Sequence, residues 1–288
     1  MVNPSILPIA IVGAGRVAAS LGRVLHERGV PVRAIASRDI EHARAAAEFI
    51  GGAEAVKIAA IPRCAANVLI AVSDAAIPEV AERLAKAGFA EGIALHTAGS
   101  RGPEALAALS AAGVSTGVLH PLQTFPSPER GAEALPGSYF AVAGDAPAIA
   151  WAREIVRMIR GRMLTVQPDR WALYHAAAVM ASNYQVTLLD AALEILEHAG
   201  VARGEGLAAL APIARATLEN VLSLGPQDAL TGPISRGDVA SVRRNLEALN
   251  AVSTETRELY RAAGRRTLPI AQQRGLAQAP LQELEKSL

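Results

Sequence analysis

The chain has 288 residues and a formal net charge of +1 at pH 7, which gives no electrostatic reason to expect nucleic acid or an anionic membrane as a partner. Its length suffices for two domains with substantial buried cores. A single cysteine, Cys64, excludes an internal disulfide, and together with the absence of a recognisable export signal it predicts a cytoplasmic protein.

The first predicted strand, Ile9–Val12, leads into a G-x-G-x-x-A sequence that opens an amphipathic helix. Gly13 makes the tight turn, Gly15 lets a pyrophosphate approach bare backbone, and Ala18 allows close packing of helix on strand. The start of the helix offers free N–H groups to phosphates. We therefore expect a dinucleotide site, the alternative being a glycine turn without a ligand. Its predicted contacts here are Gly13, Gly15, Arg16 and Val17.

The second predicted strand, Val32–Ala36, ends in Ser37-Arg38. NAD sites place an acid at this point, whereas NADP sites replace it with groups that bind the 2′-phosphate. A hydroxyl followed by a guanidinium suits that phosphate, and Asp39 is better placed as the N-cap of the next helix. Ser37 and Arg38 therefore favour NADP, unless Arg38 is merely a surface residue in a turn.

Strand patterns recur along the first half of the chain, and helical patterns separate the early ones. The later predicted strands are 56–60, 68–72, 93–97, 114–119, 139–142 and 163–166. Near-continuous apolar strands that alternate with helices predict an α/β domain with a mostly parallel, doubly wound sheet. We place this NADP-binding domain at residues 1–167.

The polar and small residues that follow the middle strands are expected to meet at one edge of the sheet, because ligands bind beyond the carboxyl ends of parallel strands. Val72, Ser73 and Asp74 follow the fourth strand, and Thr97, Ala98 and Gly99 follow the fifth; all six are predicted to bind cofactor. His96 and His120 stand at neighbouring strand ends. We expect both histidines to face the cleft, although histidines at strand ends are often structural.

Residues 168–288 predict an all-α domain. Asp169 is expected to cap a helix that runs to about Gly200, with further helices over 206–224, 238–264 and 266–275 and a loop over 225–237. The segment Trp171–Leu189 lacks acidic and basic residues over nineteen positions, long enough to suggest a membrane span. Its polar residues and alanines instead favour a buried helix of a soluble domain without a membrane partner.

His175, Ser182 and Asn183 fall on one face of this first long helix, and apolar residues continue that face, so it is predicted to point inward. Polar groups on an inward face need partners. They form either a buried network that holds the helix to the sheet or a wall that closes the nicotinamide cleft and grips substrate.

The chain resembles bacterial proteins that join a Rossmann-like NADP-binding domain to a helical domain of unknown function, within the superfamily that shares the 6-phosphogluconate dehydrogenase C-terminal fold. The resemblance rests on residues 13–17, 72–74, 96–99, 120–125, 174–178, 181–183, 230–233 and 236–238. It implies a Rossmann-type domain followed by an all-α domain and an NADP-dependent oxidoreductase that dimerises through its helices. Relatives include ketopantoate reductases and pyrroline-5-carboxylate reductases.

One departure from these relatives concerns the proton donor. Ketopantoate reductases use a lysine on the first long helix, where this chain has His175. None of the three lysines, Lys57, Lys86 and Lys286, is expected in the cleft. Histidine is the natural substitute because its pKa lies near working pH. His120 or His175 is therefore expected to donate the proton.

The remaining predicted catalytic residues are Ser182 and Asn183, which would orient the carbonyl or imine, and Arg236, which would hold a substrate carboxylate. Asp238 is expected to cap the following helix. The predicted activity is hydride transfer between NADPH and a small keto acid, of the ketopantoate kind, or an imine. The alternative is a non-catalytic NADP-binding regulatory or interaction module, and a methyltransferase is a weaker third possibility.

We expect a small-molecule substrate, no metal site, and a homodimer with a largely apolar interface. Helices such as Ser241–Ala263, with apolar residues and few aromatics, are the predicted dimer contacts.

Overall fold

The computed structural model describes residues 7–288 and divides the chain into two compact units, one that ends at Ser182 and one that spans Asn183–Leu288. The division falls after α8 (Trp171–Ala181), later than the boundary expected after residue 167. Trp171 accounts for this difference, because it is buried in a small cluster with Val118 and Ala141 of the sheet. The beginning of α8 is thereby fastened to the first unit.

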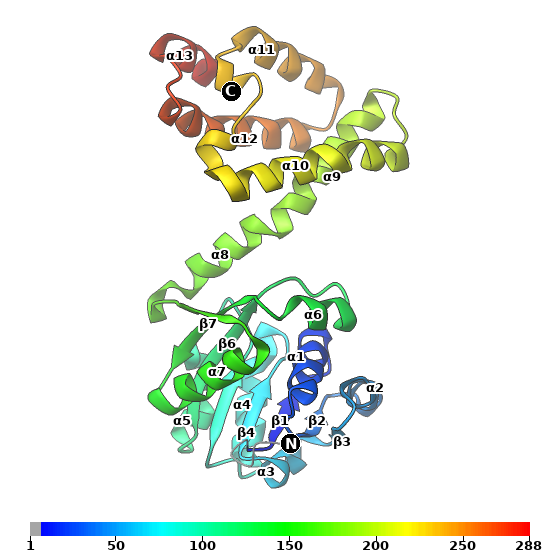
Figure 1. Cartoon of the computed structure of the whole chain (residues 1–288), viewed down its shortest axis with the longest axis vertical. Helices are drawn as coiled ribbons and strands as arrows, with labels where there is room; N and C mark the ends of the chain where they lie inside the picture. Colours follow the sequence, from blue (N-terminus) through cyan, green and yellow to red (C-terminus); the bar gives the residue numbers. More distant parts are fainter. Residues whose placement is uncertain (1–6) are drawn as a thin grey trace. The chain divides into compact units, whose positions relative to one another are not determined.

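The first unit, drawn in blue to green in Figure 1, is built on one sheet. This sheet has eight strands in the order β3-β2-β1-β4-β5-β6-β7-β8. All neighbours are parallel except β6 and β7. The predicted mostly parallel, doubly wound sheet is therefore confirmed. The strands are β1 (Ile9–Val12), β2 (Val32–Ala36), β3 (Glu54–Val56), β4 (Asn67–Ile70), β5 (Ile93–His96), β6 (Ser115–Leu122), β7 (Tyr139–Gly144) and β8 (Arg162–Thr165).

Helices cover both faces of this sheet and form a hydrophobic core with each face. Successive residues of a strand point alternately into one core and the other. In β1, Ile9 and Ile11 join the core under α1, α2 and α7, while Ala10 and Val12 join the core under α3, α4 and α5. The helices are α1 (Arg16–Glu27), α2 (Ile40–Ile50), α3 (Ile61–Cys64), α4 (Ile77–Lys86), α5 (Ala107–Ala111), α6 (Pro128–Ala134) and α7 (Ala146–Ile159).

The second unit is helical, as predicted, but its helix boundaries differ from those expected. Its helices are α9 (Asn183–His198), α10 (Arg203–Ala229), α11 (Val239–Ala248), α12 (Thr254–Gln273) and α13 (Gln278–Ser287). The helix predicted to run to Gly200 is interrupted at Ser182, whose φ of −124° and ψ of −71° are not helical. Asp169 lies in a short 3₁₀ turn rather than at the N-cap of α8.

Gly264 does not end a helix, contrary to expectation, and α12 continues through it. A side chain there would meet Leu288 at 2.6 Å, so glycine allows the C-terminus to pack closely. The short helix α13 was not predicted, because no capping side chain marks its start. Its buried leucines, Leu281 and Leu284, carry the helical spacing that indicates it.

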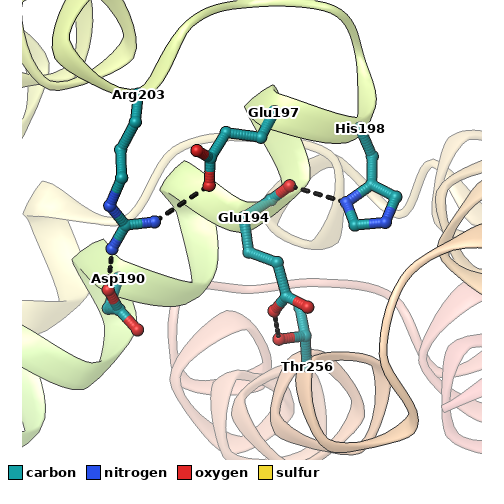
Figure 2. A network of polar contacts seen from close by, with 6 residues as sticks. All are labelled: Asp190, Glu194, Glu197, His198, Arg203 and Thr256. Atoms are coloured by element: carbon teal, nitrogen blue, oxygen red, sulfur yellow. Dashed lines mark hydrogen bonds and ion pairs between the residues drawn. The ribbon is translucent and has the colours of Figure 1, made fainter.

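The apolar residues of α11 do not form an exposed surface as the expected dimer contact requires. Val242 and Leu246 are buried with leucines of α12 and α13 in the core of the second unit. Polar contacts fasten α9 in the same unit (Figure 2). Glu194 accepts a hydrogen bond from Thr256 of α12, and Arg203 pairs with Asp190 and, at 2.9 Å, with Glu197.

The segment 171–189 is not the buried helix that the sequence predicts. Of α8 and α9, only Trp171 and Leu193 are buried in this single chain. Within the described residues, one segment, Arg203–Arg236 around α10, is long and apolar enough to cross a membrane by length and composition alone. That criterion is weak evidence, since helices of soluble proteins also meet it.

Candidate nucleotide-binding and active site

The glycine turn after β1 has the geometry that a phosphate-binding loop needs. Gly13 has a φ of +120°, and a side chain there would lie 2.0 Å from the carbonyl oxygen of Ala71, so only glycine fits. A Cβ atom on Gly15, in contrast, would meet nothing within 4 Å. The protein's own packing therefore does not require this second glycine, and the space beside it is open to a ligand.

The N-terminus of α1 begins at this open space. Gly15 is its N-cap, with no side-chain cap and no acidic residue in the first turn. Its free N–H groups and the positive end of the helix dipole favour an anion. Behind the turn, Ala18 is fully buried in the core under α1, which accounts for the small residue expected there. The donors and the open space fit a pyrophosphate.

A cavity of about 870 Å³ lies at the carboxyl ends of β1, β2, β4 and β5. Its lining includes the two predicted histidines His120 and His175. It also includes all twelve residues that the sequence analysis assigned to the cofactor, namely Gly13, Gly15, Arg16, Val17, Ser37, Arg38, Val72, Ser73, Asp74, Thr97, Ala98 and Gly99. The roles assigned to these residues stay predictions.

At the end of β2 the cavity is lined by a hydroxyl and a guanidinium. Arg38 is exposed there beside Ser37, and Asp39 is occupied as the N-cap of α2, as predicted, where it accepts from the N–H of Glu41. His42 and Arg83 also line the cavity, although sequence reasoning did not select them. They lie on α2 and α4, so only the folded chain brings them to the same cavity as Arg38.

His96 does not line the cavity, contrary to expectation. The side chain has no exposed surface, Nδ1 accepts from the N–H of Ala98, and Nε2 donates to the carbonyl oxygen of Gly102. Burial lowers the pKa of His96, which keeps the ring neutral. Its function here is structural, because it shapes the loop that presents Thr97 and Gly99 to the cavity.

A second contact ties the same loop to β4. Ser100 donates a hydrogen bond to the carboxylate of Asp74, which lines the cavity at the start of a short 3₁₀ turn after β4. The two strand ends that were expected to meet are therefore joined by a direct side-chain contact. This hydrogen bond restricts the rotation of the Asp74 side chain at the cavity wall.

His120 lies within β6, not after it, because the strand continues to Leu122 and pairs His120 with Ala141 of β7. Its Nδ1 is 2.6 Å from the hydroxyl of Tyr174 on α8. Burial, and then the nearby His175, lower the pKa of His120 to about 4. This differs from the expectation of a pKa near working pH, since His120 is neutral at pH 7.

Tyr174 is a residue of this site that sequence reasoning did not select. Burial raises the pKa of its hydroxyl to about 12, so it is protonated at working pH. Its ring packs edge-on against His120, with centroids 5.5 Å apart, and against Trp171, with centroids 5.6 Å apart. The signal in the sequence is that Trp171 and Tyr174 are three residues apart on one helix face.

The roles of the other predicted catalytic residues, Ser182, Asn183 and Arg236, stay predictions. Ser182 ends α8, where its N–H bonds to the carbonyl oxygen of Ala178. Asn183 and Arg236 belong to the second unit, Asn183 at the start of α9 and Arg236 in a 3₁₀ turn before Gly237. Asp238 caps α11, as predicted, by accepting from the N–H of Ser241.

The sheet order and the glycine-turn cavity define a Rossmann-type α/β protein with a nucleotide-sized site. Residues 1–121 match the Rossmann-like domain family, and residues 138–267 match the domain of unknown function DUF2520. The chain therefore joins these two domains, and the pairing predicted from the sequence resemblance is confirmed. No curated protein sequence matches the chain.

Solved structures share the fold over nearly the whole chain. A protein from Bacteroides fragilis described as a candidate NADP oxidoreductase is 24% identical with a TM-score of 0.75, and the match covers 90% of this chain and 97% of that one. The protein TM1727 from Thermotoga maritima is 24% identical with a TM-score of 0.70, covering 92% and 98%. A reductive aminase from Aspergillus terreus, in complex with NADPH4, cyclohexanone and allyl amine by its title, is 16% identical with a TM-score of 0.66, covering 98% and 99%.

Proposed function

We propose that the chain is an NADP-dependent oxidoreductase that acts on a small carbonyl or imine compound in the cytoplasm. The observation that carries this proposal is the cavity at the strand ends, which is lined by the uncapped N-terminus of α1, by the open space beside Gly15 and by Arg38. Bound NADPH would supply the hydride. Similarity to NADP oxidoreductases and imine reductases supports the same activity class.

The cofactor would be held at two places in this cavity. Gly13, Gly15 and the N–H groups of Arg16 and Val17 would bind the pyrophosphate. At the other end Ser37 and Arg38 would bind the 2′-phosphate, because a guanidinium and a hydroxyl offer charge-assisted hydrogen bonds to it. Residues 1–167 form the cofactor-binding part in this proposal, and 168–288 form the substrate and dimerisation part.

The substrate we propose is a small keto acid or an imine. Arg236 would pair with a carboxylate, and Ser182 and Asn183 would orient the reacting group. The titles of the fungal and bacterial imine reductases and of the reductive aminase support the imine and ketone classes. No lysine is among the residues that line the cavity, so His120 or His175 is the proposed source of the proton for a carbonyl substrate.

A homodimer is the second part of the proposal, through α8, α9 and α10 and not through α11. Large apolar side chains on these three helices stand exposed in the single chain. They include Leu173, Met180, Val186, Leu207, Ile213 and Leu222, between 52% and 77% exposed. Monomers rarely leave so many large apolar side chains exposed to water, and a second copy of the chain would cover them.

The proposal is tested by two measurements on one preparation. NADPH binding is measured by calorimetry, and NADPH consumption is then followed with keto acids, with ketones plus amines, and with cyclic imines. Binding together with consumption on one of these classes supports the oxidoreductase. Binding without consumption on any class supports the alternative of a non-catalytic NADP-binding module, and absence of NADPH binding contradicts both.

A further inference from the structure

The His120 ring is held by a chain of aromatic contacts that begins in the sheet. Trp171 is buried against β6 and β7, and it packs edge-on against Tyr174. Tyr174 packs edge-on against His120 at an interplanar angle of 86°, with its hydroxyl 2.6 Å from Nδ1. Three rings on two elements therefore fix both the place and the rotation of the imidazole.

The direction of the Tyr174–His120 hydrogen bond follows from the partners available. Within the part of the chain that the structure describes, Nδ1 of His120 is the hydrogen-bond partner found for the Tyr174 hydroxyl. A phenol has one proton to donate, and a neutral imidazole has one nitrogen that accepts. If the Tyr174 hydroxyl donates to Nδ1, its proton and the accepting nitrogen of the imidazole are both used. The imidazole proton must then reside on Nε2.

Nε2 is the nitrogen on the cavity side. A side chain on Gly99 would lie 2.6 Å from Nε2 of His120, and both residues line the cavity. Gly99 therefore leaves room for the imidazole edge at the wall. With the proton on Nε2, the histidine presents an N–H donor to whatever occupies the space beside Gly99.

We propose that Tyr174 is a positioning residue that fixes His120 as the Nε2–H tautomer, so that His120 works as a neutral donor and proton relay toward a substrate carbonyl. The catalytic part of this inference rests on the proposed function. The tautomer itself does not, because it is a property of the protein without ligands.

The relay balances in protons and charge. When a carbonyl is reduced, its oxygen becomes an alkoxide; this oxygen takes the proton from Nε2 of His120, while Nδ1 takes the proton from the Tyr174 hydroxyl. The imidazole is neutral before and after, and the negative charge moves to the phenolate. The pair is reset when water in the cavity protonates Nε2 and Nδ1 returns its proton to the phenolate; this restores the Nε2–H tautomer and the Tyr174 hydroxyl and leaves hydroxide in the solvent. An aliphatic alkoxide is a stronger base than a phenolate, so the transfer is downhill.

The charges around His120 favour a neutral ring. His175 of α8 and His96 of β5 lower its pKa, Asp74 after β4 raises it, and burial is the largest influence, for a value of about 4. The Tyr174 pKa of about 12 keeps the hydroxyl protonated over the same range. An imidazolium acid would lose its proton as the pH rises. His120 and Tyr174, in contrast, keep the same protonation states, a neutral imidazole and a protonated hydroxyl, between about pH 5 and pH 9.

The test is nitrogen NMR of the full chain labelled at histidine, without any ligand, assigned through the His120→Gln variant. The expected result is a His120 ring protonated on Nε2 alone, with no titration above pH 5.5. Tyr174→Phe keeps the aromatic packing and removes the hydroxyl, and it is expected to give a mixture of tautomers. Tyr139→Phe, a change to an exposed tyrosine of β7, is the control and should leave the His120 signals unchanged.

A wild-type His120 ring protonated on Nδ1, or one that titrates near pH 6.5, would overturn the inference. So would a Tyr174→Phe variant whose His120 signals match those of the wild type. Loss of activity on every substrate class would refute the proposed function but would leave these signals unchanged, so the two failures are distinguishable. If Tyr174→Phe unfolds, the wild-type tautomer and titration still decide the question.

Discussion

Replacing Arg38 tests the cofactor assignment at the residue that distinguishes NADP from NAD. In Arg38→Ala the guanidinium at the end of β2 is lost, while the turn at Gly13 and the cap at Asp39 remain. A hydrogen bond to a charged group contributes about 1.5–3 kcal/mol. NADPH affinity should therefore fall roughly 10- to 150-fold. NADH lacks the 2′-phosphate, so its affinity should stay within about twofold.

The assay is calorimetric titration of both cofactors at two salt concentrations. Weakened binding of NADPH with rising salt is expected for the wild type and should be smaller in the variant. Arg33→Ala is the matched control, because Arg33 is exposed on the same strand but does not line the cavity. Equal losses for NADPH and NADH would refute the reasoning.

Three further predictions concern catalysis, pH and assembly. His120→Ala and Tyr174→Phe should each lower kcat on a carbonyl substrate by ~10²-fold or more, with KM and NADPH affinity nearly unchanged; steady-state kinetics showing full turnover in both would contradict the relay. The pKa of His120 is about 4 in the folded chain and 6.5 ordinarily, so between these pH values the unfolded chain binds more protons than the folded chain. Chemical denaturation should therefore show stability falling from pH 6.5 to pH 4, less steeply in His120→Gln, and an identical slope would contradict the burial argument. Light scattering at micromolar concentration should give a dimer that Leu222→Glu weakens, and a wild-type monomer would refute the apolar interface.

Much of the first unit could be predicted from the sequence because its signals are local. The continuous apolar run and the glycine turn define β1, and the observed bounds of β1 and β2 equal the predicted ones. The order of the strands follows from a few chirality and connection rules. Because ligands bind beyond the carboxyl ends of neighbouring parallel strands, Ser73 and Gly99 could be predicted to line one cavity.

The errors arise where tertiary contacts decide. His96 has the spacing of a cleft residue, but its burial and its two hydrogen bonds depend on how the 96–102 loop folds back. Tyr174 reads as part of an apolar helix face until Nδ1 of His120, fifty-four residues earlier, is found beside its hydroxyl. Position on a helix gives no information about a partner on a distant strand.

The helical unit was predicted least well for the same reason. The break at Ser182 has no glycine or proline to mark it, and Gly264 resembles a helix end although Leu288 packs against it. The apolar residues of α11 suggested a dimer surface, yet they fill the core of their own unit. Apolar spacing predicts that a face is buried, but it does not say what covers that face.

The central claim is that the glycine cradle beside α1 binds the cofactor of a reductase. The most direct measurement compares NADPH consumption by the wild type and by Gly15→Asp on the panel of keto acids, ketones with amines, and cyclic imines. A Cβ atom at position 15 would meet no protein atom within 4 Å, so we expect the variant to fold with an unchanged Tm. Its carboxylate would repel the pyrophosphate. We predict consumption by the wild type on at least one class and none by the variant. Equal consumption by both proteins, or none by the wild type on any class, would contradict the claim.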